Sequence, residues 1–289
     1  MAAAARAMHR VRTVAALRKA VARFRAKGLS VALVPTMGAI HEGHLSLVRR
    51  ARRDCDRVVA SIFVNPLQFG PTEDFARYPR PVHDDRARFA RAGVDLLWEP
   101  AIAEIYPAGD RTRVRVSGLT EVLEGASRPA HFEGVTTVVM RLLNAVHPDV
   151  LWLGQKDAQQ AIVIERMVKD LLVPVRVRRG ATVRERDGLA LSSRNVYLGA
   201  EERSQAVALH EGLRTARARL DAGERSAARL VAAVRAVWQR HPLVLEDYVA
   251  VVDAQTLEPL RAVRGRVLVA VAARVGPARL IDNFEWSPR

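Results

Sequence analysis

The stretch that decides the fold is VALVPTMGAIHEGHLSLVRRA, residues 31–51. Its first part, VALVP, is a short apolar run typical of a buried strand, and from Gly43 onward the apolar residues recur at helical spacing. The turn between them contains two histidines, His41 and His44. The stretch therefore predicts a strand, a glycine-bearing turn and a helix, with both imidazoles on one face at the positive end of that helix.

This turn has the composition of an anion site. Backbone N–H groups at a helix N-terminus receive phosphate oxygens, and imidazoles add donors for developing negative charge. Gly38 and Gly43 have the spacing of a phosphate-binding loop, but His44-Leu45 follows where Lys and then Ser or Thr are required. The histidines also lack the H-E-x-x-H spacing of a zinc site, and no third ligand stands nearby. A pair of surface histidines with capping roles is the alternative that the turn alone leaves open.

Further apolar runs alternate with helical patterns over the first two thirds of the chain. They occupy residues 58–65, 94–100, 150–154 and 173–179. The alternation predicts an α/β fold, a Rossmann-like, doubly wound parallel sheet with helices on both faces, which we assign to residues 1–182. Ligands of such sheets bind at the carboxyl ends of the strands. An early helix is expected between a cap at Thr13 and a stop at Gly28.

The character of the sequence changes after residue 182. A hairpin turning at Asp187-Gly188 is followed by two long helices rich in alanine and arginine, and then by further apolar runs. We expect residues 183–289 to form a smaller α+β domain.

Composition limits the class of protein. The 289 residues are 49% hydrophobic, yet no run approaches the roughly 18 to 20 apolar residues of a membrane helix. The net charge of +15 would suit a nucleic-acid binder, but the arginines are dispersed and no nucleic-acid-binding motif accompanies them. A single cysteine, Cys55, rules out an intrachain disulfide and fits a reducing compartment. We expect a cytoplasmic protein without nucleic-acid or membrane partners.

Five blocks in one order carry a resemblance to a known family: PTMGAIHEGHLSLV, FVNPLQF, HFEGVTTVV, LGQKDAQQ and DGLALSSRN. Together they resemble the pantoate–β-alanine ligase (pantothenate synthetase) family of the HIGH-type nucleotidyltransferases, over nearly the whole chain. The resemblance implies ATP-dependent condensation of pantoate with β-alanine through a pantoyl adenylate, with release of pyrophosphate and AMP. A related nucleotidyltransferase that activates a different acid is the rival enzyme.

The resemblance also implies site residues. Those matching ATP-binding positions are Met37, Gly38, Ala39, Ile40, His41, Glu42, Gly43, His44, Gly154, Gln155, Lys156, Asp157, Val183, Leu191, Ser192, Ser193 and Arg194. Catalytic roles fall on His44 as proton donor, and on His41, Lys156, Ser192, Ser193 and Arg194. The plainer alternatives are a solvated lysine at a helix end and a loop serine pair. The C-terminal domain, which carries the LSSR loop, is expected to act as a lid.

The remaining matches concern the acid substrate and the metal. Gln68 and Gln160 match residues that hold pantoate, and Asn65 and Arg128 match positions that line the same region. Asp84 and Asp85 match an acidic pair near a Mg²⁺ site, although carboxylates that complement a helix dipole are an equal reading. The family also implies a homodimer.

Overall fold

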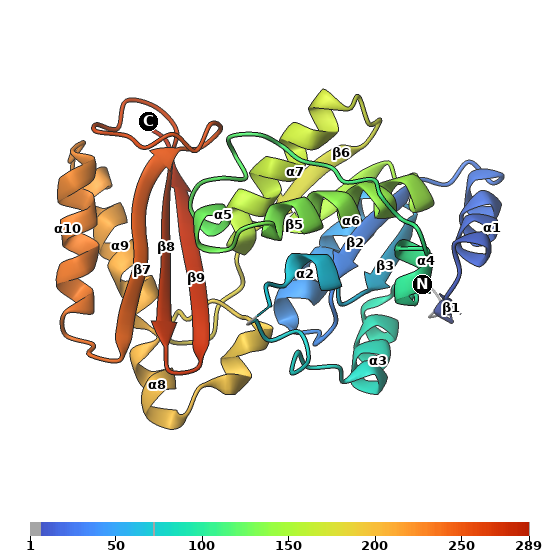
Figure 1. Cartoon of the computed structure of the whole chain (residues 1–289), viewed down its shortest axis with the longest axis horizontal. Coiled ribbons are helices and arrows are strands. Elements are labelled where there is room, and N and C mark those ends of the chain that lie inside the picture. The colour runs from blue at the N-terminus through green and yellow to red at the C-terminus, as the bar shows by residue number, and fades with distance from the viewer. Residues whose placement is uncertain (1–6, 72, 289) are drawn as a thin grey trace, which may run out of the picture. The chain divides into compact units, whose positions relative to one another are not determined.

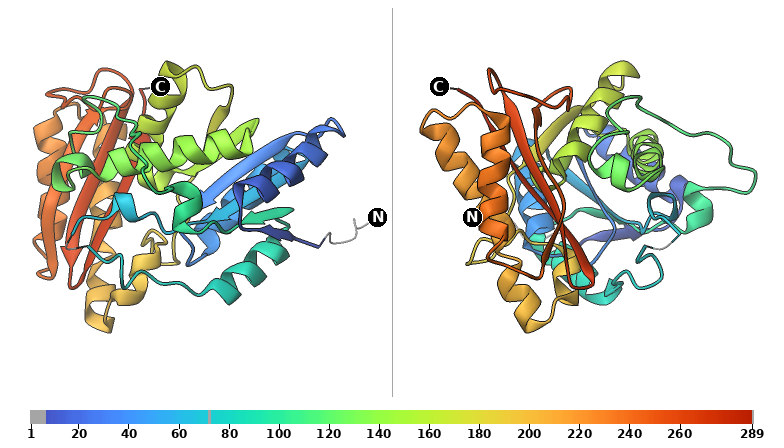
Figure 2. Two further views of the ribbon diagram at one scale, coloured as in Figure 1. Left: turned by 45° about the vertical axis from the view of Figure 1, so that its right-hand side comes forward. Right: turned by 60° about the vertical axis from the view of Figure 1, so that its left-hand side comes forward.

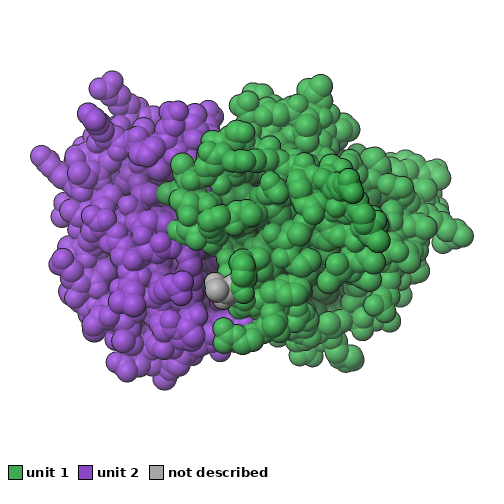
Figure 3. All heavy atoms as spheres, in the orientation of Figure 1, with its two compact units in different colours: residues 1–154, 160–181 green, residues 155–159, 182–289 purple. Residues whose placement is uncertain are grey.

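The computed structural model describes residues 7–71 and 73–288 and divides into two compact units (Figure 3). The first comprises residues 1–154 and 160–181, and the second comprises residues 155–159 and 182–289. Residues 1–6 of the predicted first domain lie outside the described residues. The division into domains at residue 182 stays a prediction.

The first unit is built on a six-stranded sheet in which every pairing is parallel (Figure 1). The strand order is β1-β4-β3-β2-β5-β6. The strands are β1 (His9–Val11), β2 (Val31–Thr36), β3 (Arg57–Ile62), β4 (Leu96–Trp98), β5 (Val150–Gly154) and β6 (Arg176–Gly180). The predicted fold class is confirmed. The chain switches direction across the sheet between β2 and β5, so the carboxyl end of β2, where the histidine turn begins, lies at a ligand-binding position of this fold.

Helices cover both faces of this sheet (Figure 2). Alternate residues of β2 show the two faces, since Leu33 belongs to one apolar cluster with α1, α6 and α7, and Val34 belongs to another with α2 and α3. These helices are α1 (Val14–Arg25), α2 (Glu42–Asp54), α3 (Val82–Ala92), α6 (His131–Val146) and α7 (Ala158–Asp170), with the short α4 (Ile102–Ile105) and α5 (Glu124–Ser127) between α3 and α6. The 3₁₀ turns are η1 (Pro66–Gln68), η2 (Gln155–Asp157) and η3 (Ser193–Tyr197).

The predicted start of the first helix is confirmed, whereas α1 ends at Arg25 and a turn continues to the predicted stop at Gly28. Thr13 caps α1, with its hydroxyl accepting a hydrogen bond from the Ala16 N–H at 3.2 Å. Gly28 ends the segment at φ +69°, a left-handed conformation that glycine adopts without steric cost.

The second unit is an antiparallel sheet with helices, as predicted for an α+β fold. The sheet has the order β7-β8-β9, and α9 and α10 lie along one face of it (Figure 1). Its elements are α8 (Ala200–Gln205), α9 (Ala208–Asp221), α10 (Ala227–Trp238), β7 (Val244–Asp253), β8 (Val267–Val275) and β9 (Ala278–Trp286). The predicted turn at Asp187-Gly188 is present, with Gly188 at φ +100° and Arg184 bridged to Ala190. No helix among the described residues is long and apolar enough to cross a membrane.

Candidate active site

The two histidines lie where the sequence predicts, at the N-terminus of α2. His41 is the N-cap residue, and its Nδ1 accepts a hydrogen bond from the Gly43 N–H at 3.1 Å. His44 makes the reciprocal contact, in which its Nδ1 accepts a hydrogen bond from the His41 N–H at 3.3 Å. The ring centroids are 4.1 Å apart. The rings are therefore fixed to the backbone of the helix they cap.

These hydrogen bonds determine which ring nitrogen carries the proton. An Nδ1 that accepts a hydrogen bond has no proton, so the neutral ring holds its proton on Nε2. In the neutral form, both histidines can therefore donate a hydrogen bond from Nε2. Gly43 permits the close approach of the His41 ring, since a Cβ at residue 43 would lie 2.8 Å from His41 Cε1.

The backbone just before the histidines is unusual. Gly38 and Ala39 have φ angles of +93° and +50°, two consecutive residues in the left-handed region. The carboxylate of Asp85, from the first turn of α3, accepts hydrogen bonds from the N–H groups of Ala39 at 2.9 Å and Ile40 at 2.7 Å. We call residues 37–44 the histidine turn.

A second polar turn, residues 65–68, follows β3, and we call it the glutamine turn. Asn65 is 1% exposed, and its amide uses all of its hydrogen-bonding capacity. Its Nδ2 donates to Gln68 Oε1 at 3.1 Å and to the Gly134 carbonyl at 3.0 Å, and its Oδ1 accepts from the Leu67 N–H and from the Tyr106 hydroxyl at 2.7 Å. Asn65 thereby orients the Gln68 side chain, which also donates to Met37 Sδ.

Arg128 and His131 fix the backbone of the same turn. Arg128 pairs with Glu73 and donates to the Gln68 carbonyl at 3.1 Å, and His131 Nδ1 contacts that carbonyl at 2.8 Å. Because a carbonyl only accepts, Nδ1 carries the proton, and Nε2 is left to accept from Arg128 Nη1 at 3.1 Å. Burial, and then the charge of Arg128, lower the pKa of His131 to about 4, so this ring is neutral.

Helix α6 packs directly against the glutamine turn. A Cβ at Gly134 would lie 2.3 Å from the Leu67 carbonyl oxygen, so only glycine allows this approach. The blocks FVNPLQF and HFEGVTTVV therefore form one structural feature. Sequence reasoning missed the roles of Tyr106 and His131, because their partners lie about 40 to 60 residues away in the chain.

The predicted metal ligands differ in their surroundings. Asp84 is exposed, whereas both oxygens of Asp85 accept backbone hydrogen bonds. Burial raises the pKa of Asp85, although the Ile40 and Ala39 N–H groups act in the opposite direction. Among the described residues, no group of three or more His, Cys, Asp or Glu side chains is arranged to hold a metal ion. The metal role of the pair stays a prediction, and the side chains present do not form a protein cage for Mg²⁺.

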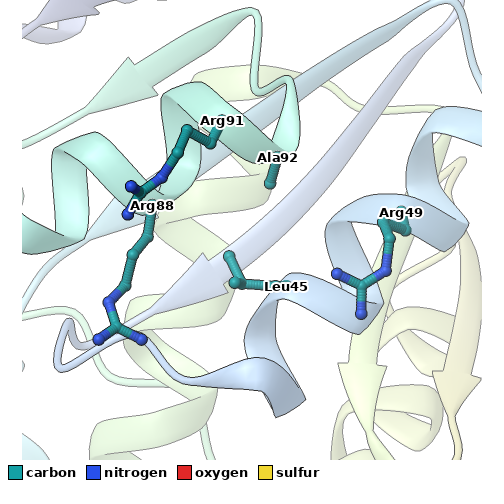
Figure 4. Close-up of a pocket in the computed structure, with 5 residues that line it drawn as sticks. All are labelled: Leu45, Arg49, Arg88, Arg91 and Ala92. Carbon is teal, nitrogen blue, oxygen red and sulfur yellow. The ribbon is translucent and has the colours of Figure 1, made fainter.

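A surface hollow of about 420 Å³ lies between α2 and α3 (Figure 4). It is lined by Leu45, Arg49, Arg88, Arg91 and Ala92. Arg49 is paired with Glu42, and the three guanidinium groups make this side of α2 electropositive.

In the second unit, the turn η2 is held by the last strand. Asn283 Nδ2 donates to the carbonyls of Lys156 at 2.7 Å and Gln155 at 3.1 Å, and Gln155 Nε2 contacts Asn283 Oδ1 and Glu285 Oε1. Lys156 Nζ lies 3.6 Å from Asp157 Oδ1. Sequence reasoning did not find this use of β9, because an asparagine in an apolar strand has no local signature.

The LSSR segment follows a hairpin that is anchored to the same strand. Leu191 N–H donates to the Val183 carbonyl at 3.0 Å, and Ser192 Oγ accepts from the Arg194 N–H at 3.2 Å at the start of η3. Asp282, 3% exposed on β9, binds Arg184 through both carboxylate oxygens, at 2.5 and 2.9 Å. The hairpin that precedes Ser193 and Arg194 is therefore anchored to β9. Gln160, the last predicted residue, is half-buried on α7 of the first unit.

A parallel sheet with a histidine-bearing helix N-terminus at its switch point is the arrangement expected of a nucleotidyltransferase. The family model described as pantoate-beta-alanine ligase matches residues 9–285. A pantothenate synthetase of Moorella thermoacetica is 56% identical over 276 residues, which cover 96% of this chain and 98% of that protein.

Solved structures agree with these sequence matches. The crystal structure of pantothenate synthetase from Thermus thermophilus has a TM-score of 0.93 and 50% identity, covering 97% of this chain and 100% of that chain. A pantoate-beta-alanine ligase from Francisella tularensis, complexed with beta-gamma ATP and beta-alanine, has a TM-score of 0.79 and 33% identity, with 96% and 97% covered. The chain belongs to the pantoate–β-alanine ligase family, and its reaction is the ligation of pantoate to β-alanine.

Proposed function

We propose that the chain joins pantoate to β-alanine in two steps, of which the first consumes ATP. A carboxylate oxygen of pantoate attacks the α-phosphorus of ATP. The bond between that phosphorus and the oxygen that bridges it to the β-phosphorus breaks, and pyrophosphate leaves. The amine of β-alanine then attacks the carbonyl carbon of the pantoyl adenylate. The bond between that carbon and the phosphate oxygen breaks, so AMP leaves, the amine loses a proton and pantothenate is formed.

The histidine turn is the proposed site of the triphosphate. The first N–H groups of α2 and the helix dipole favour phosphate oxygens, and residues 37–44 surround that terminus. His44 donates from Nε2 to the charge that grows on the departing pyrophosphate, and His41 assists it from the same nitrogen. The Nδ1 hydrogen bonds of both rings support this assignment, because they leave the proton on Nε2.

The glutamine turn is the proposed site of pantoate. The hydroxyls of pantoate need neutral partners, which the Gln68 and Gln160 amides supply. Asn65 and Arg128 act on the same region, and their contacts favour a supporting role, since Asn65 orients the Gln68 side chain and Arg128 holds its carbonyl. The pantoate carboxylate can then be presented in a fixed orientation.

In the second unit, the proposal gives Lys156 the role of a point charge for phosphate and gives Ser192, Ser193 and Arg194 the binding of pyrophosphate. Residues 154–157 and Leu191 contribute backbone groups, and Val183 contacts adenine. The anchoring of η2 and of the 183–191 hairpin to β9 supports these assignments, because a phosphate-binding turn requires a fixed backbone.

Three further elements complete the proposal. Mg²⁺ accompanies ATP, held by phosphate oxygens and water, and supplies counter-charge to the triphosphate. The chain forms a homodimer, and it works in the cytoplasm, where its buried thiol, Cys55, stays reduced. Family membership supports the first two elements, and the single cysteine supports the third.

The observation that carries the proposal is the histidine pair, fixed by its own helix backbone at the switch point of the sheet. Phosphorus NMR of the purified protein with Mg-ATP tests it. We expect pyrophosphate only when pantoate is present, with about one adenylate per active site accumulating, and AMP release when β-alanine is added. ATP that stays intact with pantoate, but is consumed with another small acid, would contradict the substrate assignment.

A further inference from the structure

The carboxylate of Asp85 contacts the histidine turn from a different helix, α3. Asp85 is 1% exposed, and each of its oxygens accepts one backbone hydrogen bond, Oδ2 from Ala39 at 2.9 Å and Oδ1 from Ile40 at 2.7 Å. Hydrogen bonds to a buried charged group are short and strong. The carboxylate therefore spans the two peptide groups that lead into His41.

The backbone of the turn needs such a partner. Ala39 has φ +50°, a conformation that is sterically unfavourable for a non-glycine residue. Hydrogen bonds to a charged group are stronger than those between neutral groups, so the two bonds to Asp85 stabilise this conformation. Gly38 completes the fit, because a Cβ there would lie 3.1 Å from Asp85 Oδ2.

Asp85 is itself held firmly by the core. It lies in the first turn of α3, and Phe89, one turn further on, is fully buried in the apolar cluster that α2 also contributes to. Ile40, whose N–H binds Asp85, is 4% exposed in the same cluster. The position of the turn is thus set by the packing of α3 against the sheet.

We infer that Asp85 is a positioning residue for the proposed phosphate site: its carboxylate holds Gly38 and Ala39 in the left-handed conformation that places His41 and His44. The inference rests on the proposed function of the histidine turn. This positioning role differs from the metal-binding role that the family resemblance implies. Both oxygens of the Asp85 carboxylate already accept hydrogen bonds from backbone N–H groups. Asp54, which is exposed at the end of α2 and has no role in the proposed site, offers a matched comparison.

The test compares Asp85→Asn with Asp54→Asn, which make the same change of charge. In Asp85→Asn one oxygen becomes an NH₂ group that faces an N–H donor, so the turn loses an acceptor. We expect kcat to fall about 10- to 100-fold, since a displacement of about 1 Å has effects of this size. The KM for pantoate should change by less than about threefold, because the glutamine turn is untouched. Asp54→Asn should leave kcat within about twofold of wild type.

Two additional readouts separate positioning from metal binding. Amide hydrogen exchange should show that Ala39 and Ile40 are protected in the wild-type protein and in Asp54→Asn, and that they lose protection in Asp85→Asn. Raising Mg²⁺ should not restore the activity of Asp85→Asn. Restoration by Mg²⁺, or wild-type kcat in Asp85→Asn, would overturn the inference.

If Asp85→Asn does not fold, the inference can still be tested on the wild-type protein. Fast exchange of the Ala39 and Ile40 amides in the wild-type protein would overturn it without any variant. Wild-type turnover, measured in the same assay, distinguishes this inference from the proposed function: a failure of the wild type to use ATP with pantoate would count against the function, whereas normal turnover in Asp85→Asn would count against Asp85 alone.

Discussion

The histidine turn and the glutamine turn lie at the carboxyl ends of adjacent strands, β2 and β3, but they are stabilised differently. The histidine turn depends on one buried carboxylate and on the two rings that cap α2. The glutamine turn is held by its own Asn65 and by several groups from elsewhere in the chain, among them Tyr106, Arg128 and His131. The comparison indicates that the proposed phosphate site is held by few contacts, whereas the proposed pantoate site is supported by a network.

Replacement of His44 should have the largest effect on catalysis. His44→Ala removes the proposed donor to the departing pyrophosphate, and we expect kcat to fall by at least ~10²-fold. The lost capping contact with the His41 N–H should lower the free energy of unfolding by only about 1 kcal/mol. Steady-state kinetics and urea unfolding measure the two effects separately.

The control for His44 is His83→Ala, which removes an exposed histidine from α3 of the same unit. It should leave kcat and stability near the wild-type values. Wild-type turnover in His44→Ala would remove His44 from the mechanism and, with it, the contrast between the two turns.

Gly134→Ala tests the glutamine turn through its packing. The added Cβ would lie 2.3 Å from the Leu67 carbonyl oxygen, so α6 or the turn must shift. Such overpacking should lower the free energy of unfolding by about 1 to 3 kcal/mol. We expect the KM for pantoate to rise while the Ala39 and Ile40 amides keep their protection. Gly265→Ala is the matched control, because a Cβ there meets nothing within 4 Å; equal effects of the two substitutions would show that the contact with Leu67 is unimportant.

His131 should make stability depend on pH. Its pKa in the folded protein is lowered to about 4, mainly by burial and by Arg128, against the opposing charges of Glu124 and Glu73. Between pH 7 and pH 5 the unfolded chain binds a proton that the folded protein does not, so stability falls as the pH falls. Linkage gives a loss of about 2 kcal/mol over this range.

His131→Asn isolates this contribution, since its amide can donate to the Gln68 carbonyl from the position of Nδ1 and does not titrate. Urea unfolding at pH 7, 6 and 5 should show a shallower dependence on pH for this variant than for the wild-type protein. Parallel curves for the two proteins would show that the pKa of His131 is the same in the folded and unfolded states, which would contradict the lowered value.

Tyr106→Phe should have the smallest effect. It removes the hydroxyl that donates to Asn65 Oδ1 at 2.7 Å and keeps the ring that Arg141 covers. We expect a loss of about 1 kcal/mol in the free energy of unfolding and a modest rise in the KM for pantoate. If the KM rose as much as in Gly134→Ala, the network around Asn65 would be less redundant than its several contacts indicate.

Much of the architecture could be predicted from the sequence. Apolar runs such as residues 31–35 and 150–154 identify strands by local composition, and Thr13 identifies a helix start by its hydroxyl. Strand β1 escaped prediction because only Val11 of its three residues is buried and its pairing with β4 is set by contacts about 85 residues away.

Candidate residues of the site could be named from the sequence as matches to a family, but their partners could not. The hydrogen bonds from Ala39 and Ile40 to Asp85 join residues about 45 positions apart, and nothing in the local sequence distinguishes Asp85 from Asp84. The burial of Phe89 on the same face of α3 sets the two apart in the structure. Roles that depend on long-range contacts of this kind require the fold.

Transfer of oxygen-18 from pantoate to AMP is the most direct test of the two-step reaction. Pantoate labelled in both carboxylate oxygens is incubated with the protein, Mg-ATP and β-alanine, and the phosphate products are examined by mass spectrometry and phosphorus NMR. Attack on the α-phosphorus followed by amide formation predicts one labelled oxygen in AMP and none in pyrophosphate. Unlabelled AMP, or label in inorganic phosphate, would show that pantoate is activated in another way.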